Sequence, residues 1–313
     1  MNKSSMELML RPATIGGEII GNLHTYIDDL LANMNNPFHT AEIRETGNTY
    51  KLIDKAAERH LVGRFDDLSD TYGEDIEIVG EERLDVYDTS DSDVAVLFDT
   101  IDGTDLLERN LGNWCTSIIV FNTNSNNILG AYVGLSDGDT FFTIDEDIAS
   151  RSDHLHARGK YSFRKDEIID SFENNINKNV DLSESSICMY GQKFSKIEVL
   201  RSYTSTRKSQ EWIEKNSSNA RFYNLAGNPM MVKMVEGDID IVFELDGQHP
   251  HDVAPGAYIA KNFGATCVDL DGNTIESEMI ANPEQPSLSY VLASNEELAH
   301  SFLDVFVYPN RQI

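Results

Sequence analysis

The sequence has few cysteines and no long hydrophobic run. Its three cysteines, Cys115, Cys188 and Cys267, lie far apart and show neither a disulfide framework nor the spacing of zinc ligands. We expect them to be buried free thiols, which suits a reducing compartment. No apolar run is long enough to cross a membrane, and the start of the chain lacks the apolar core of a signal peptide. We therefore expect a soluble cytoplasmic protein with no membrane partner.

Basic residues are also scarce. The chain has 25 lysines and arginines against 53 aspartates and glutamates, which gives a formal net charge of -28. Because a phosphate backbone is bound through a basic face, this balance argues against nucleic acid as a partner. A small anionic substrate would also be repelled at long range unless bound cations reverse the field locally. Glycine-rich nucleotide loops, P-loop spacing and a GxSxG elbow are absent.

With 313 residues, of which 40% are apolar, the chain can form one large domain or two lobes. We expect an N-terminal α+β lobe over residues 1–150 and a C-terminal α/β lobe over residues 151–313, because an antiparallel first half precedes alternating strands and helices. Helices are predicted at 15–34, 50–62, 104–109, 228–237, 252–263 and 295–306. Strands are predicted at 76–82, 94–98, 116–121, 128–135, 140–144, 186–190, 238–244, 265–268 and 289–293.

The most informative stretch is Asp-Thr-Ile-Asp-Gly-Thr-Asp at residues 99–105, directly after the apolar run 94–98. Asp99 and Asp102 are separated by two residues, so a turn can aim both carboxylates at one hard divalent cation. Gly103 allows close approach to the backbone, and Thr104 begins a helical segment whose N–H groups would point at an anion. Carboxylates for a metal beside amides for a phosphate indicate a metal-dependent phosphatase.

Three other segments carry acids in a suggestive context. The strand 76–82 ends in Gly80-Glu81-Glu82, and Asp252 stands at a predicted helix start. Asp54 falls beside the apolar stripe of the helix 50–62, where an isolated acid is by itself an ordinary solvated residue.

Taken together, these segments resemble the inositol monophosphatase family of lithium-sensitive, magnesium-dependent phosphatases, which includes fructose-1,6-bisphosphatases and adenosine bisphosphate phosphatases. The family turn Asp-Pro-Ile-Asp-Gly-Thr corresponds to 99–104, its Gly-Glu-Glu to 80–82, and its Trp-Asp-x-Ala-Ala-Gly to 251–256. Its Thr-x-x-Asp-x-x-x-Glu helix corresponds to the segment with Asp54 and Glu58. The order and approximate spacing agree from about residue 49 to 272. The resemblance implies a layered α-β-α-β-α sandwich and a homodimer.

The sequence departs from the family pattern at three motif positions. Thr100 replaces a proline, and we expect it to loosen the turn without removing a ligand. His251 replaces a tryptophan, and Pro255 replaces an alanine in a first helical turn, where proline is tolerated. Residues 145–186 show little resemblance.

The resemblance implies two or three Mg2+ ions. Glu81, Asp99 and the Ile101 carbonyl would hold the activating ion. Asp99, Asp102 and Asp252 would hold a second ion on the leaving-group side. Glu82 would support this ligand set from outside or hold a further, weaker ion.

The resemblance also implies catalytic and substrate-binding residues. Thr104, paired with Asp54, would take part in removing a proton from the attacking water. The amides of Gly103 and Thr104 would receive the phosphate, and Glu244, at the end of the strand 238–244, would bind substrate hydroxyls.

These roles predict hydrolysis of inositol phosphate or a similar small sugar phosphate, because few cations are evident for a second phosphate. Fructose 1,6-bisphosphate and 3'-phosphoadenosine 5'-phosphate stay open as alternative substrates. A non-catalytic metal-binding regulatory protein of the same fold is the other alternative. It predicts the loss of a ligand or of the Thr104–Asp54 pair, and the sequence has lost neither.

Overall fold

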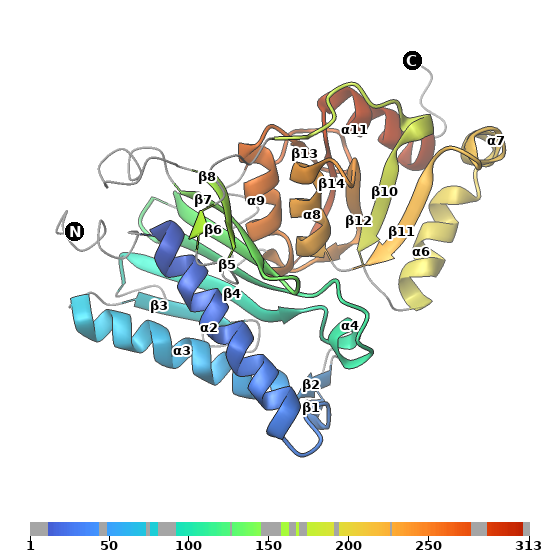
Figure 1. Cartoon of the computed structure of the whole chain (residues 1–313). Coiled ribbons are helices and arrows are strands. Elements are labelled where there is room, and N and C mark those ends of the chain that lie inside the picture. The colour runs from blue at the N-terminus through green and yellow to red at the C-terminus, as the bar shows by residue number, and fades with distance from the viewer. Residues whose placement is uncertain are drawn as a thin grey trace. The chain divides into compact units, whose positions relative to one another are not determined.

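The computed structural model describes residues 12–43, 49–72, 76–80, 92–125, 127–144, 158–162, 167–168, 174–190, 194–225, 227–276 and 287–308. The chain divides into two compact units, Met1–Phe172 and Glu173–Ile313. Each unit is built on its own mixed sheet and its own helices (Figure 1).

The first unit contains a seven-stranded sheet with the strand order β3-β4-β5-β6-β7-β8-β9. β3 is parallel to β4, and every other neighbouring pair is antiparallel. The strands are β3 Ile76–Gly80, β4 Val94–Asp102, β5 Cys115–Asn122, β6 Ile128–Leu135, β7 Asp139–Ile144, β8 Arg158–Ser162 and β9 Glu167–Ile168. The predicted meander over β5, β6 and β7 is confirmed, whereas β8 and β9 were not predicted, because their polar sequences carry no apolar alternation.

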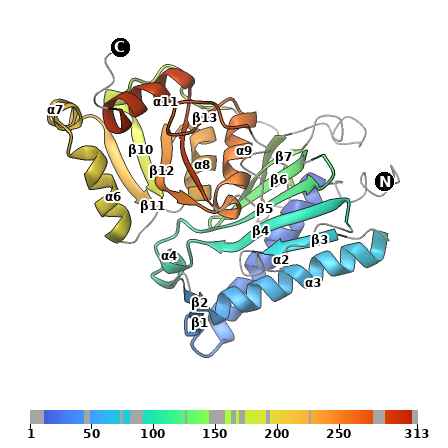
Figure 2. The same ribbon diagram turned by 180° about the vertical axis from the view of Figure 1, so that it is seen from behind.

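Helices α2 (Pro12–Asn33) and α3 (Leu52–Tyr72) lie side by side along this sheet (Figures 1 and 2). Their apolar stripes meet the strands in one core, which includes Ile20, Leu23, Ile27, Ile53, Ala57 and Leu61. The prediction for α3 was wrong at both ends. Tyr50 belongs to the short strand β2 (Thr49–Lys51), which pairs with β1 (Thr40–Ile43). The helix continues past residue 62 because Phe65 and Leu68 extend the stripe that contains Leu61.

β4 is the element that carries the aspartates. It was predicted to end at Phe98 but continues through Asp102, and all nine residues are buried. Its register with β5 shifts between Asp99 and Asp102, as in a β-bulge. The prediction of a turn at 99–102 is therefore wrong. The chain turns only at Gly103, whose φ of 96° is left-handed, and the short helix α4 (Thr104–Glu108) follows.

The second unit contains a five-stranded sheet in the order β11-β10-β12-β14-β13. The strands are β10 Ser186–Tyr190, β11 Arg221–Leu225, β12 Ile241–Gln248, β13 Thr266–Val268 and β14 Leu288–Ala293. Only β14 runs antiparallel to its neighbours.

Helices cover this sheet on two sides. Ile241, Phe243 and Leu245 of β12 pack into a core with α6 (Phe194–Thr204), α7 (Arg207–Asn216) and α11 (Glu296–Phe302). Alternate residues of a strand point to opposite faces, which leaves the other face of β12 for α8 (Gly227–Glu236). α8 in turn packs on α9 (Ala254–Asn262).

Two predictions in the second unit are corrected. The strand predicted at 238–244 spans Ile241–Gln248, so Glu244 lies within β12 and not at its end. Asp252 does not cap α9. It ends a 3-10 turn, η3 (Pro250–Asp252), and Val253 is the N-cap residue. Pro250 starts that turn, and the Asp252 N–H donates to the His249 carbonyl at 3.1 Å.

Smaller features follow the sequence more closely. The predicted helix 295–306 is α11, capped by Asn295, and continues as the π-helical turn η4 (Leu303–Val307). All three cysteines are buried free thiols, as expected. None of the helices in the described ranges is both long and apolar enough to cross a membrane.

Candidate active site

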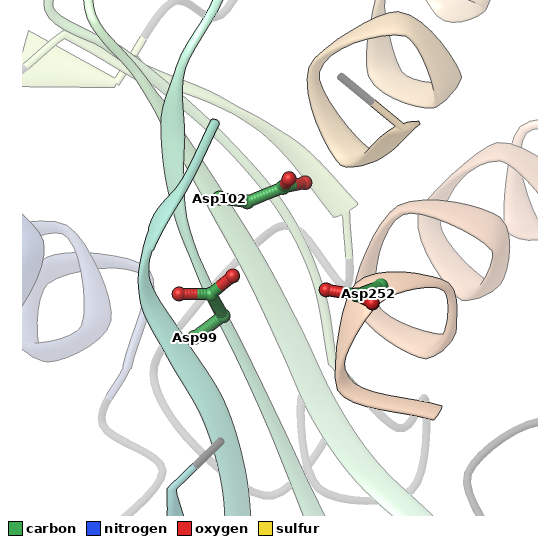
Figure 3. A group of neighbouring side chains, drawn as sticks. All are labelled: Asp99, Asp102 and Asp252. Carbon is green, nitrogen blue, oxygen red and sulfur yellow. The ribbon is translucent and has the colours of Figure 1, made fainter. Parts of the chain in front are cut away.

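Asp99 and Asp102 form a buried pair of carboxylates at the end of β4 (Figure 3). Their exposed fractions are 6% and 2%, and a carboxylate oxygen of one lies within 4.8 Å of a carboxylate oxygen of the other. The Ile101 N–H donates to Asp99 Oδ1 at 2.9 Å, which fixes the orientation of that side chain. Two buried like charges at this separation are unfavourable, and a divalent cation would offset both their repulsion and their desolvation. The donor set therefore fits a hard divalent cation.

The backbone between the two aspartates is held by a chain of hydrogen bonds that reaches α2. The Thr116 hydroxyl donates to the Thr100 carbonyl at 2.8 Å, and His24 Nε2 lies 3.1 Å from the same hydroxyl oxygen. Because Thr116 donates its proton to Thr100, His24 Nε2 must carry the hydrogen of the second bond. Thr100 is buried, so replacement of the family proline does not leave a loose turn here.

Thr104 and Asp54 form the second part of the site. Thr104 Oγ1 lies 2.9 Å from Asp54 Oδ1 and 2.9 Å from the Ile101 carbonyl oxygen, so the hydroxyl proton has two possible acceptors. The Lys51 N–H donates to Asp54 Oδ2 at 3.0 Å. Burial raises the pKa of Asp54 to about 6, although the hydrogen bonds from Lys51 and Thr104 and the Lys51 charge act in the opposite direction.

Glu58 lies beside the end of β3. A Cβ atom on Gly80 would stand 2.6 Å from Glu58 Oε1 and 2.9 Å from the Phe98 ring, so a larger residue at this position would require both side chains to shift. Gly80 pairs with Phe98, the residue before Asp99. Glu81 and Glu82 lie outside the described residues.

In the second unit, the main chain of Asp252 is held in the η3 turn. Gln248 Nε2 donates to the Asp252 carbonyl at 3.1 Å, and the buried Tyr290 hydroxyl donates to Gln248 Oε1 at 2.9 Å. Figure 3 draws the Asp252 side chain at this turn, ahead of α9.

The two residues near Asp252 that depart from the family motif, His251 and Pro255, both fit the packing of this turn and of α9. His251 is buried, and its Nε2 lies 3.5 Å from Asp252 Oδ1. Asn228 of α8 connects the turn to α9, since its Nδ2 donates to the His251 carbonyl at 3.3 Å and its Oδ1 accepts from the Gly256 N–H at 2.9 Å. Pro255 lies in the first turn of α9, where its missing N–H is tolerated.

Glu244 is almost fully buried and paired. Its Oε1 accepts from Lys196 Nζ at 2.9 Å and from the Asp246 N–H at 2.7 Å. Its Oε2 is buried without a hydrogen-bond partner among the described residues. Burial raises the pKa of Glu244, and Lys196 and the Asp246 N–H oppose that rise.

The sequence matches the model of the inositol monophosphatase family over residues 22–305. The chain belongs to the inositol monophosphatase family. Membership supports a metal-dependent phosphatase. A comparison with curated proteins found no match.

Solved structures of inositol monophosphatases share the fold of this family member. Inositol monophosphatase II of Staphylococcus aureus is 17% identical with a TM-score of 0.64, covering 95% of this chain and 96% of its own. The Thermotoga maritima enzyme is 15% identical with a TM-score of 0.62, covering 92% and 93%. A Pyrococcus horikoshii protein described as similar to inositol-1 monophosphatase is 22% identical with a TM-score of 0.58, covering 90% and 95%. At these identities the likeness shows the fold alone.

Within the first unit of this inositol monophosphatase family member, the structure brings together most of the residues that the sequence singled out there: Asp54, Asp99, Ile101, Asp102, Gly103 and Thr104. Asp252 and Glu244 belong to the second unit, where both act electrostatically on Tyr290.

Sequence reasoning missed the partners that hold the site. His24 is a single histidine in the apolar stripe of α2, which is its only signal. Lys51 and Lys196 carry no signal, because the carboxylates that they pair with are distant in sequence.

Proposed function

We propose that this chain is a Mg2+-dependent phosphomonoesterase that hydrolyses inositol phosphate or a similar small sugar phosphate with an activated water. One observation carries the proposal: the buried carboxylates of Asp99 and Asp102 stand beside a threonine that is hydrogen-bonded to a third carboxylate, Asp54. Family membership supports the same reaction class.

Asp99, Asp102 and the Ile101 carbonyl would hold the ions, together with Glu81 and with Asp252 from the second unit. Carboxylate and carbonyl oxygens are the ligands that Mg2+ prefers. When bound, two such ions supply a nucleophilic water near neutral pH and neutralise charge on the phosphoryl oxygens. The proposal includes two or three ions, and Glu82 would support the ligand set from outside or hold a further, weaker ion.

Thr104 and Asp54 would handle the proton of the attacking water. Donation from Thr104 Oγ1 to Asp54 Oδ1 leaves the hydroxyl oxygen to accept a hydrogen bond from water and leaves the Ile101 carbonyl oxygen available as a ligand. A carboxylate with a pKa of about 6 takes up a proton more readily than an ordinary aspartate does.

The phosphate would be received by the N–H groups of Gly103 and Thr104. Gly103 has no Cβ and adopts a left-handed conformation, so the backbone is open to close approach at this point.

Glu244 would accept hydrogen bonds from substrate hydroxyl groups. A polyol monophosphate is favoured over a bisphosphate because Lys196, the cation beside Glu244, is already paired with Glu244 and Asp246. The homodimer and the cytoplasmic location stay predictions.

The direct test is phosphate release from a panel of esters by the purified, Mg2+-loaded protein. The panel contains inositol 1-phosphate, other sugar monophosphates, fructose 1,6-bisphosphate and 3'-phosphoadenosine 5'-phosphate. We expect the highest kcat/KM with a polyol monophosphate. A higher kcat/KM with fructose 1,6-bisphosphate or with 3'-phosphoadenosine 5'-phosphate would show that the proposed substrate is wrong. Mg2+ binding without hydrolysis of any ester would favour the non-catalytic regulatory protein.

A further inference from the structure

Lys51 is a buried cation held between two carboxylates of α4. Its Nζ lies 2.7 Å from Asp105 Oδ1 and 2.7 Å from Glu108 Oε2, and its side chain is only 9% exposed. The ammonium group also lies 5.8 Å from the centre of the Phe38 ring. These contacts fix the position of the ammonium group, and they bind α4 to it through Asp105 and Glu108.

The main chain of the same residue contacts the other side of the site. Lys51 ends β2, and its N–H donates to Asp54 Oδ2 while Thr104 donates to Oδ1. The two oxygens of Asp54 thus have different partners, one of which is fixed by Lys51. Lys51 connects directly to Asp54 through its backbone and to the helix that begins with Thr104 through its side chain.

We propose that Lys51 is a positioning residue for the Thr104–Asp54 pair. The proposal rests on the proposed function, because it assigns Lys51 to the proton-handling part of that reaction. Lys51 does not touch substrate or reacting atoms. It sets the distance and orientation between the two groups that do.

The length of α4 explains why such an anchor is needed. The helix has five residues, and a single helical turn gains too few hydrogen bonds to offset the entropy of ordering it. Its place must come from tertiary contacts, and the bonds from Lys51 to Asp105 and Glu108 supply two of them.

The charges of Lys51, Asp105 and Glu108 support the same role for Lys51 as the geometry does. Burial lowers the pKa of Lys51, but the hydrogen bonds and charges of Asp105 and Glu108 outweigh burial and raise it, so the ammonium form is retained. The charge of Asp105 raises the pKa of Asp54 and that of Lys51 lowers it. Lys51 therefore offsets the effect of the carboxylate next to Thr104.

The chain offers a matched control in the same unit. Lys160 of β8 lies 2.7 Å from Asp139 and 5.2 Å from the centre of the Phe141 ring, and its side chain is 12% exposed. Lys160→Met removes a lysine of similar burial and ring contact whose carboxylate partner, Asp139, lies on β7 and not on α4.

The test compares Lys51→Met, Lys51→Arg and Lys160→Met by steady-state kinetics. We expect Lys51→Met to lower kcat by ~10- to 100-fold, since misplacement of catalytic groups by about 1 Å costs up to ~100-fold, with KM and the Mg2+ dependence changed far less. Lys51→Arg should recover most of the loss, because a guanidinium can bind both carboxylates. Lys160→Met should keep the kcat of the unaltered chain.

A second readout does not need activity. Amide hydrogen exchange over residues 103–109 should accelerate in Lys51→Met and not in Lys160→Met. Unchanged exchange and unchanged kcat in Lys51→Met would overturn the inference, as would an equal loss of kcat in both methionine variants. Absence of hydrolysis by the unaltered chain would overturn the proposed function instead, and exchange would still show whether Lys51 anchors α4.

Discussion

At the scale of single residues, the site depends on where one hydroxyl proton goes. Thr104 has two acceptors at the same distance, Asp54 Oδ1 and the Ile101 carbonyl. The first arrangement would serve the proposed proton removal, and the second would only stabilise the start of α4. Removing the hydroxyl tests whether Thr104 contributes to catalysis at all.

Thr104→Ala should lower kcat by ~100- to 10,000-fold, the usual contribution of general acid–base assistance. The Mg2+ concentration at half-maximal rate should change little, because the Ile101 carbonyl and the carboxylates remain. Initial rates across a Mg2+ titration check both statements. An unchanged kcat, or a loss that extra Mg2+ restores, would remove this role from Thr104.

The raised pKa of Asp54 predicts that the free energy of unfolding depends on pH. Its pKa rises from 3.8 to about 6 on folding, so between these values the folded chain keeps a proton that the unfolded chain has released. The resulting stabilisation is complete below about pH 4 and is lost as the pH rises through about 6. The free energy of unfolding of the metal-free protein should therefore fall across this window relative to Asp54→Asn. Urea denaturation at pH 4, 5, 6 and 7 compares the two slopes, and parallel profiles would contradict the shift.

At the scale of elements, β4 shows how far sequence reasoning reaches. The apolar run 94–98 predicted the strand, and the motif 99–104 predicted that Asp99 and Asp102 act together. The shift in register with β5 was not predictable, because it depends on pairing with a strand whose partner residues are distant in sequence. Lys51 and Lys196 were not predicted as partners of the site for the same reason, because the carboxylates that they pair with are distant in sequence.

Element boundaries failed where tertiary contacts override local pattern. β12 runs past Glu244 because β14 pairs with it as far as Gln248. Asp252 looked like a helix cap, but the two prolines at 250 and 255 divide the segment into a 3-10 turn and α9.

The packing of α8 against α9 gives a stability prediction. A Cβ atom on Gly256 would lie 2.8 Å from Asn228 Oδ1 and 2.9 Å from Met231 Cβ, so Gly256→Ala should destabilise by about 1–3 kcal/mol through overpacking. Gly63 of α3 is the control, because nothing lies within 4 Å of its added Cβ. Gly63→Ala should stabilise by about 0.5–1 kcal/mol. Denaturant unfolding of both variants checks this, and an equal change in both would contradict the packing argument.

At the scale of the whole molecule, the acidic balance is the main constraint on function. A chain with a net charge of -28 repels an anionic ester at long range, and buried aspartates add to that field locally. Divalent cations at Asp99 and Asp102 would reverse the sign where the phosphate binds. The acidic balance and the proposed metal site are therefore parts of one requirement, and we propose that hydrolysis depends on Mg2+ for this reason.

The most direct measurement is phosphate release as a function of Mg2+ concentration, for the unaltered chain and for Asp99→Asn, after removal of metal with EDTA. The account predicts no hydrolysis in excess EDTA, recovery on adding Mg2+, and a large loss of turnover with weaker Mg2+ dependence in Asp99→Asn, because Asp99 would contribute to both ion positions. Full activity in excess EDTA, or an Asp99→Asn variant that responds to Mg2+ like the unaltered chain, would contradict the metal-dependent phosphatase.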